Sequence, residues 1–148
     1  MQAERDTAIK AFLSDHGWGD AARAPLADDA SFRRYERLRR AGQMAVLMDA
    51  PPPHEDVRSF RKIADHLRRL GYSAPEIYAA DETLGLLLLE DLGDDTFTRV
   101  LARAERGGDE TSLYENAVDV LIDLHRRPAG EAIPPGLAVY DDEKLMDE

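Results

Sequence analysis

The fold is decided by residues 29–93, which read DASFRRYERLRRAGQMAVLMDAPPPHEDVRSFRKIADHLRRLGYSAPEIYAADETLGLLLLEDLG. An extended run at 33–39 and an apolar run at 44–48 flank Ala41-Gly42, a pair typical of a tight turn. Short apolar runs bounded by turn residues favour buried strands over helices. We therefore expect these two runs to form an antiparallel hairpin.

The clearest helix is predicted at 55–70, after three prolines that cannot continue a strand. Glu55 and Asp56 suit its N-terminal end, and basic residues followed by a glycine suit its C-terminal end. Its apolar side chains recur at helical spacing and form one stripe: Val57, Phe60, Ile63, Ala64, Leu67 and Leu70. Strands are predicted after this helix, at 77–80 and 84–89.

Further elements are expected on both sides of this stretch. They are helices at 4–15, 97–104, 113–124 and 141–148, a strand at 24–27 and a loop at 128–135. The helix at 113–124 is apolar over much of its circumference, so we expect it to be buried on several sides.

The composition excludes several classes of function. The net charge is −11, with 30 acidic and 19 basic residues, and such a field repels nucleic acids and anionic membranes. The absence of cysteine excludes disulfides, thiolate metal sites and thiol nucleophiles, and it suits a cytoplasmic protein. We predict neither a signal peptide nor a transmembrane helix.

Three segments, in this order, resemble the aminoglycoside phosphotransferase and choline kinase-like family: residues 29–35, 46–52 and 87–93. They are most similar to its branch of bacterial anomeric sugar kinases, which act on N-acetylmuramate and N-acetylglucosamine. Residues 121–125 are similar to the first large-lobe helix of the family. The resemblance implies an α+β fold: a protein-kinase-like small lobe at 1–92, with an antiparallel sheet and a helix, then a linker and the start of the large lobe at 93–148.

The resemblance also implies ATP-dependent phosphorylation of a hydroxyl on a sugar or aminoglycoside-like small molecule, with Mg²⁺. The implied cofactor-binding residues are Ser31, Phe32, Arg33, Arg34, Met48, Glu90, Asp91 and Leu92. The turn and strand at 31–35 would cover the ATP phosphates, with positive charge from Arg33 or Arg34; alternatively, these two are solvated strand arginines. Backbone groups of 90–92 would bind the adenine edge, so we expect side-chain changes there, such as Asp91→Ala, to matter little.

The sequence departs from the kinase pattern at the third strand. A phosphate-binding lysine usually stands there, paired with a glutamate on the next helix. Here the strand offers Met48 and Asp49, and the helix offers Ser59 and Phe60, so the ion pair is replaced as a whole. Near phosphate, Asp49 would need Mg²⁺, an arginine or a sugar hydroxyl opposite it; we expect it to end the strand and bind the proline-rich turn.

A second departure concerns the chemistry. The sequence contains no His-x-Asp loop with a downstream asparagine, and the segment at His125 does not match one. We therefore assign no catalytic residue or metal ligand, expect the Mg²⁺ ligands in a C-terminal part beyond this sequence, and expect no transferase activity from the chain alone. Its apolar helices after Gly93 should favour self-association. A non-catalytic nucleotide- or partner-binding lobe, and a piece of a longer polypeptide, stay open as alternatives.

Overall fold

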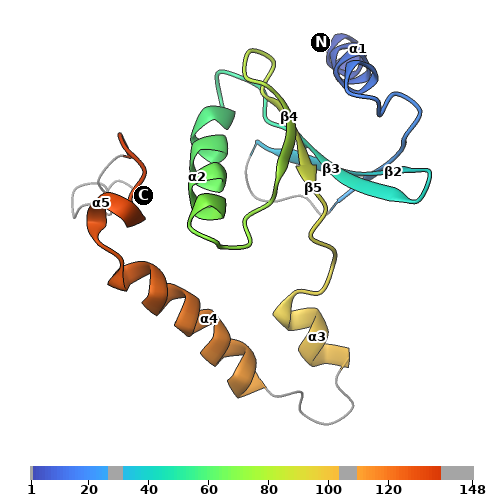
Figure 1. The fold of residues 1–148 in the computed structure, drawn as a ribbon. Helices are drawn as coiled ribbons and strands as arrows, with labels where there is room; N and C mark the ends of the chain where they lie inside the picture. Colours follow the sequence, from blue (N-terminus) through green and yellow to red (C-terminus); the bar gives the residue numbers. More distant parts are fainter. Residues whose placement is uncertain (1, 27–31, 104–109, 138–148) are drawn as a thin grey trace. The chain divides into compact units, whose positions relative to one another are not determined.

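The computed structural model describes residues 2–26, 32–103 and 110–137. The chain divides into two units, Met1–Gly93 and Asp94–Glu148, and each is described by itself. Unit 1 contains a sheet and two helices, and unit 2 contains helices (Figure 1). The implied position of Ser31 and the expected helix at 141–148 lie outside the described residues.

The sheet of unit 1 is five-stranded and antiparallel throughout, with the order β1-β2-β3-β5-β4. Its strands are β1 (Ala22–Pro25), β2 (Arg34–Arg40), β3 (Gln43–Asp49), β4 (Ile77–Asp81) and β5 (Leu86–Glu90). The predicted hairpin is confirmed as β2 and β3, whose ends Arg40 and Gln43 are paired. Ala41 and Gly42 have φ values of 45° and 81°, the positive values that a two-residue type I′ turn requires.

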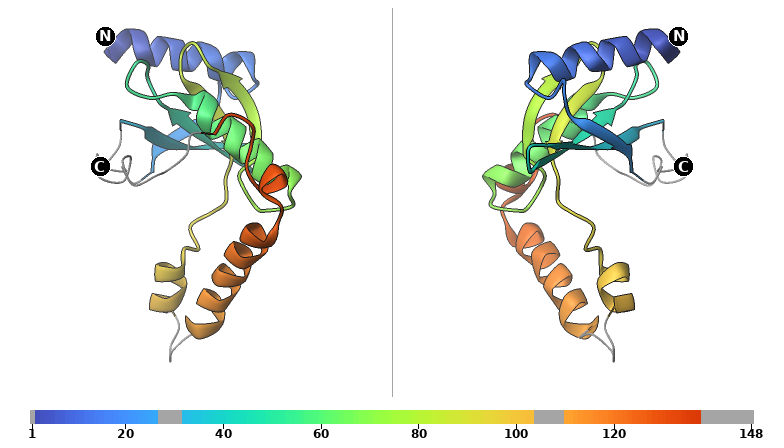
Figure 2. Two further views of the ribbon diagram at one scale, coloured as in Figure 1. Left: turned by 90° about the vertical axis from the view of Figure 1, so that its left-hand side faces the viewer. Right: turned by 90° about the vertical axis from the view of Figure 1, so that its right-hand side faces the viewer.

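One helix covers each face of this sheet (Figures 1 and 2). Because side chains alternate along a strand, β3 sends Ala45 and Leu47 to one face and Val46 and Met48 to the other. The first pair packs in a cluster with α1 (Gln2–Asp15), and the second in a cluster with the start of α2 (Val57–Arg69). The sheet therefore lies between two apolar layers, which confirms the α+β class.

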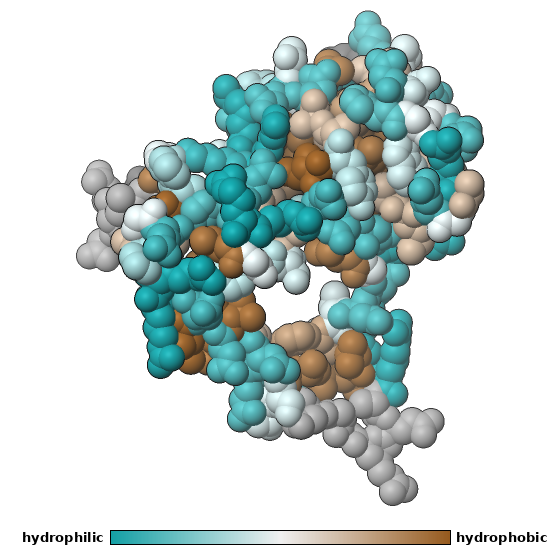
Figure 3. Space-filling model, viewed as in Figure 1, coloured by the Kyte–Doolittle hydropathy of each residue, from teal (hydrophilic) through white to brown (hydrophobic). Residues whose placement is uncertain are grey.

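Unit 2 is built differently. Its helices are α3 (Phe97–Arg103), α4 (Glu110–Arg126) and α5 (Ala129–Ala132), and none of their described residues is buried. Apolar side chains are visible on the surface of these helices (Figure 3), and Leu121 is 55% exposed. The burial expected for 113–124 is therefore not found in the described part of the chain. None of the helices within the described ranges is long and apolar enough to cross a membrane.

Three details differ from the predictions. The strand expected at 24–27 lies at 22–25, where its pairing with β2 is strengthened by an ion pair between Arg23 and Glu36. The segment expected as a loop at 128–135 contains the single turn α5. Ile63 is 37% exposed, although it belongs to the apolar stripe of α2.

Candidate functional site

The segment Glu90–Gly93 leads out of the sheet at the end of β5, and several of its backbone groups are already paired. Glu90 N–H donates to the Glu76 carbonyl at 2.8 Å, and Gly93 N–H donates to Asp91 Oδ1 at 2.9 Å. Leu92 is 60% exposed, and its N–H donates to no acceptor among the described residues. Gly93 has a φ of +81°, which glycine adopts without strain, so the chain can turn here. The linker thus offers an unpaired donor beside a turn.

The carboxylate of Asp91 is held by an arginine from a strand distant in sequence. Arg37 Nε donates to Asp91 Oδ2 at 2.7 Å, and Arg37 Nη2 donates to Oδ1 at 3.1 Å. The side chains are 12% and 3% exposed, respectively. Arg37 lies on β2 opposite Val46 of β3, and Val46 pairs with Leu89 of β5. This bidentate ion pair therefore spans β3. It ties the linker to the hairpin.

The neighbouring carboxylate, Glu90, points to a different part of the lobe. Its Oε2 accepts Glu76 N–H at 3.0 Å and lies 3.4 Å from Arg68 Nη1 at the end of α2. A hollow of about 310 Å³ lies beside these groups, lined by Arg68, Tyr72, Glu90 and Leu92 among others. Because the Glu90 and Arg68 side chains are 37% and 39% exposed, this ion pair is weaker than the one at Asp91.

The residues implied to face phosphate lie at the start of β2 and do not form one cluster. Phe32 is 66% exposed and stacks on His54, with ring centroids 4.8 Å apart. Arg33 Nε donates to Glu55 Oε2 at 2.8 Å. Burial lowers the pKa of the Arg33 guanidinium, but the Glu55 carboxylate and Tyr35 outweigh it and hold the pKa above its ordinary value. Arg34 is exposed and forms no ion pair within the described part of the chain.

The positions that lack the lysine and glutamate are filled by apolar packing. Met48 has no exposed surface, and Phe60 packs against the cluster that contains it. Asp49 ends β3 as expected, but its carboxylate does not serve the proline-rich turn: it accepts Arg5 Nε at 3.0 Å and Arg5 Nη2 at 2.6 Å. The charge of Asp49 is therefore already compensated on the α1 face.

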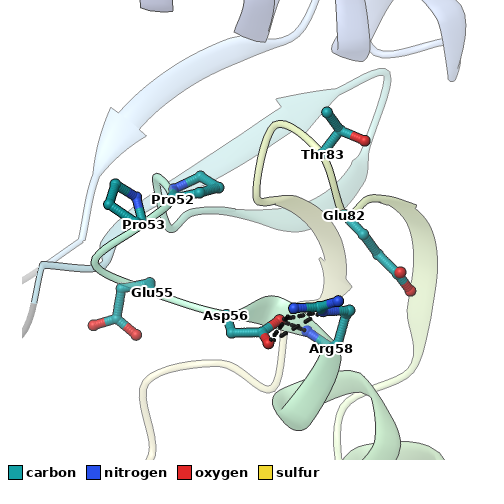
Figure 4. Close-up of a pocket in the computed structure, with 7 residues that line it drawn as sticks. All are labelled: Pro52, Pro53, Glu55, Asp56, Arg58, Glu82 and Thr83. Atoms are coloured by element: carbon teal, nitrogen blue, oxygen red, sulfur yellow. Dashed lines mark hydrogen bonds and ion pairs between the residues drawn. The ribbon is translucent and has the colours of Figure 1, made fainter.

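A separate hollow of about 570 Å³ lies between the segment before α2 and the turn between β4 and β5 (Figure 4). Its carboxylates are engaged by arginines, in the pairs Glu55–Arg33, Asp56–Arg58 and Glu82–Arg61. No group of three or more potential ligands that could hold a metal ion occurs among the described residues. We therefore assign no cation to this hollow.

The sequence interpretation missed Arg37 and Arg5. Each arginine is distant in sequence from the carboxylate that it binds: the separation is 54 residues for Arg37 and Asp91, and 44 residues for Arg5 and Asp49. No local motif marks such a pair, because the topology of the sheet brings the partners together. The one feature of the sequence that could have drawn attention to Arg37 is strand alternation, which places it on the same sheet face as Tyr35.

Residues 23–148 match the phosphotransferase enzyme family. Among curated proteins, the N-acetylmuramate/N-acetylglucosamine kinase of Caulobacter vibrioides is 37% identical, over 98% of this chain and 48% of its own length. The kinase of the same name from Pseudomonas aeruginosa is 38% identical, over 97% of this chain and 41% of its own length. That of Neisseria meningitidis is 30% identical, over 82% and 35%. The chain thus spans about half the length, or less, of these curated relatives.

Proposed function

The chain belongs to the phosphotransferase enzyme family, and from this premise we propose that unit 1 is the nucleotide-binding small lobe of an ATP-dependent kinase. The α+β lobe and the names of the relatives support this proposal. The activity belongs to the intact family member, in which unit 2 begins the large lobe. The kinase transfers the terminal phosphoryl group of ATP to a sugar hydroxyl.

The observation that carries this proposal is the hydrogen bonding of the linker, in which Leu92 N–H donates to no acceptor among the described residues. An adenine base presents both a hydrogen-bond acceptor and a donor at its edge, so it suits a backbone segment with unpaired groups. Leu92 N–H is such a donor, and it stands at an exposed position directly before the turn at Gly93. Leu92 therefore receives adenine through its backbone, which requires no particular side chain.

The acceptor is an N-acetylated amino sugar of the kind that the relatives' names state. The runner-up is an aminoglycoside, whose positive charges would be attracted by the net charge of −11. The two classes differ in charge, so an assay that compares them at low and high salt separates a specific site from long-range attraction. Mg²⁺ would supply charge compensation at the phosphates, and no described residue is assigned to it.

Calorimetric titration with ATP tests the nucleotide site. Replacing Leu92 by proline removes the N–H, and we expect it to weaken ATP binding about tenfold, whereas Leu92→Ala keeps the N–H and should bind nearly as well as the parent chain. Equal losses in both variants, or no binding of ATP by the parent chain, would refute the assignment.

The two arginines at the start of β2 need a different comparison. We expect alanine at a phosphate-binding arginine to weaken ATP by about 1.5–3 kcal/mol while leaving adenosine unchanged. Arg34 is exposed and Arg33 is already paired with Glu55, so the larger loss is expected for Arg34→Ala. If both variants affect ATP and adenosine alike, the arginines are surface residues without a phosphate role.

The alternative function is a non-catalytic lobe that binds nucleotide or a partner protein. The exposed apolar side chains of α4 favour this alternative, since helices of this kind associate with other surfaces. Incubation with ATP, Mg²⁺ and a panel of acetylated amino sugars and aminoglycosides separates the two. We expect no turnover by this chain alone, and turnover by a family-length polypeptide that contains it.

A further inference from the structure

The two acidic residues at the end of β5 hold the linker from two sides. Asp91 is joined to Arg37 on β2, and Glu90 is joined to the backbone of Glu76 and to Arg68 at the end of α2. In the strand order of the sheet, β2 and β4 lie on opposite sides of β5. A segment held in both directions cannot rotate freely about its own axis.

We propose that Glu90 and Asp91 are positioning residues, which fix the linker so that Leu92 N–H points outward to the ligand. This inference rests on the proposed function. It goes beyond it by giving the linker side chains a role that a backbone-only adenine site would not have. It also reverses the expectation from the sequence that Asp91→Ala changes ATP binding little.

The hydrogen bonds around Asp91 explain why the donor would be Leu92. Asp91 Oδ1 accepts both Arg37 Nη2 and Gly93 N–H, at 3.1 and 2.9 Å. Arg37 therefore holds the carboxylate in place, and the carboxylate in turn engages Gly93 N–H. Glu90 N–H is engaged by Glu76. Glu90 N–H and Gly93 N–H are therefore occupied, whereas Leu92 N–H is left to an outside acceptor, and the side-chain contacts of Glu90 and Asp91 set the orientation of the peptide before Leu92.

Asp91 is expected to contribute more than Glu90. Its side chain is 3% exposed and accepts both prongs of a guanidinium, a geometry that lysine cannot reproduce. The Glu90 side chain is 37% exposed. We therefore expect Asp91→Ala to weaken ATP about tenfold, Arg37→Lys to have a similar but smaller effect, and Glu90→Gln to have the smallest.

Amide-resolved NMR on the 148-residue chain tests the proposal, with hydrogen exchange measured before and after addition of ATP. In the parent chain, Gly93 N–H should be protected without ligand and Leu92 N–H should become protected only with ATP. In Asp91→Ala, Gly93 should lose its protection, and the preference for ATP over GTP should fall. A merely structural role would leave this preference unchanged, since partial unfolding lowers the affinity for both nucleotides equally.

Glu36→Ala is the matched control. Like Asp91, Glu36 accepts a bidentate hydrogen bond from an arginine, Arg23; it lies on β2, as Arg37 does, and its arginine partner is not in the linker. Its removal should lower stability without changing the nucleotide preference. If Gly93 is unprotected in the parent chain while ATP still protects Leu92 N–H, the positioning role is overturned and the proposed function stays intact. If ATP changes amides other than Leu92, both the positioning role and the assignment of adenine to Leu92 are overturned. If ATP changes no amide, the nucleotide site itself is wrong and the positioning role falls with it, even where Gly93 is protected.

Discussion

Unit 1 closes an apolar core on both faces of its sheet, whereas the described helices of unit 2 bury no side chain. The difference follows from the elements. A strand sends side chains to two faces, and α1 and α2 cover both. A helix such as α4 presents its apolar surface to whatever lies beside it. An apolar helix sequence therefore indicates that the helix packs against another surface, but does not say which one. In unit 1 the sheet provides that surface for α1 and α2.

The largest effect should come from the same substitution made in each unit. Leu47 is fully buried in β3, so Leu47→Ala should destabilise the chain by about 2–5 kcal/mol. Leu121 on α4 is 55% exposed, so Leu121→Ala should change stability by less than about 0.5 kcal/mol. Urea unfolding measures both, and light scattering should show less self-association in the Leu121 variant. Equal destabilisation would mean that α4 is buried in solution.

Glycine-to-alanine substitutions give the next contrast. At Gly85, a Cβ would stand 2.1 Å from the Ala50 carbonyl oxygen, and φ is +67°, so Gly85→Ala should cost about 3 kcal/mol. At Gly130 in α5, a Cβ would meet nothing within 4 Å, and alanine should stabilise this helical turn by roughly 0.5–1 kcal/mol. The midpoint of thermal unfolding should fall in Gly85→Ala and rise in Gly130→Ala. If Gly85→Ala is tolerated, the turn before β5 can move away from the segment after β3 that contains Ala50.

Ion pairs should follow the same division. Arg5→Met would leave Asp49, whose side chain is 10% exposed, without its partner, at a cost of about 2 kcal/mol. The pair between Arg127 and Asp123 in unit 2 is more exposed, so Arg127→Met should cost only about 0.3–0.5 kcal/mol. Unfolding at low and high salt separates them, because screening weakens the exposed pair more. Similar costs for both would argue against the partial burial of Asp49.

The smallest effect concerns the ends of helices. Asp56 caps α2 by accepting Arg58 N–H, whereas α5 begins at Pro128 without a side-chain cap. The Arg58 side chain, and then its backbone N–H, lower the pKa of Asp56 below its ordinary 3.8. The contribution of Asp56 is therefore complete above pH 3.8 and is lost as pH falls through the lower value in the folded chain.

Circular dichroism during acid titration measures this effect. Asp56→Asn can still cap the helix but cannot titrate. The acid unfolding of this variant should therefore lack the contribution that protonation of Asp56 makes in the parent chain. Asp56→Ala should weaken α2 at neutral pH as well. An identical acid profile in the parent and the asparagine variant would exclude a role of Asp56 in acid unfolding.

Much of unit 1 could be predicted from local sequence. The Ala41-Gly42 turn and the apolar runs beside it predict the hairpin, and the stripe from Val57 to Leu70 predicts α2, because these patterns are set within a few residues. The short edge strand β1 was displaced from its predicted range by two residues. An edge strand pairs on one side only, so its ends depend on β2 and on the Arg23–Glu36 ion pair.

The sequence by itself determined the fold class, the family resemblance and the linker as the candidate for adenine. Only the tertiary structure decided which side chains serve that linker. Arg37 reaches Asp91, and Arg5 reaches Asp49, because the strands place charges from distant parts of the chain within hydrogen-bonding distance. Hydrophobic periodicity is a local property and can be seen in a single segment. The partner of a buried charge depends on sheet order and register, which arise only when the segments pack together.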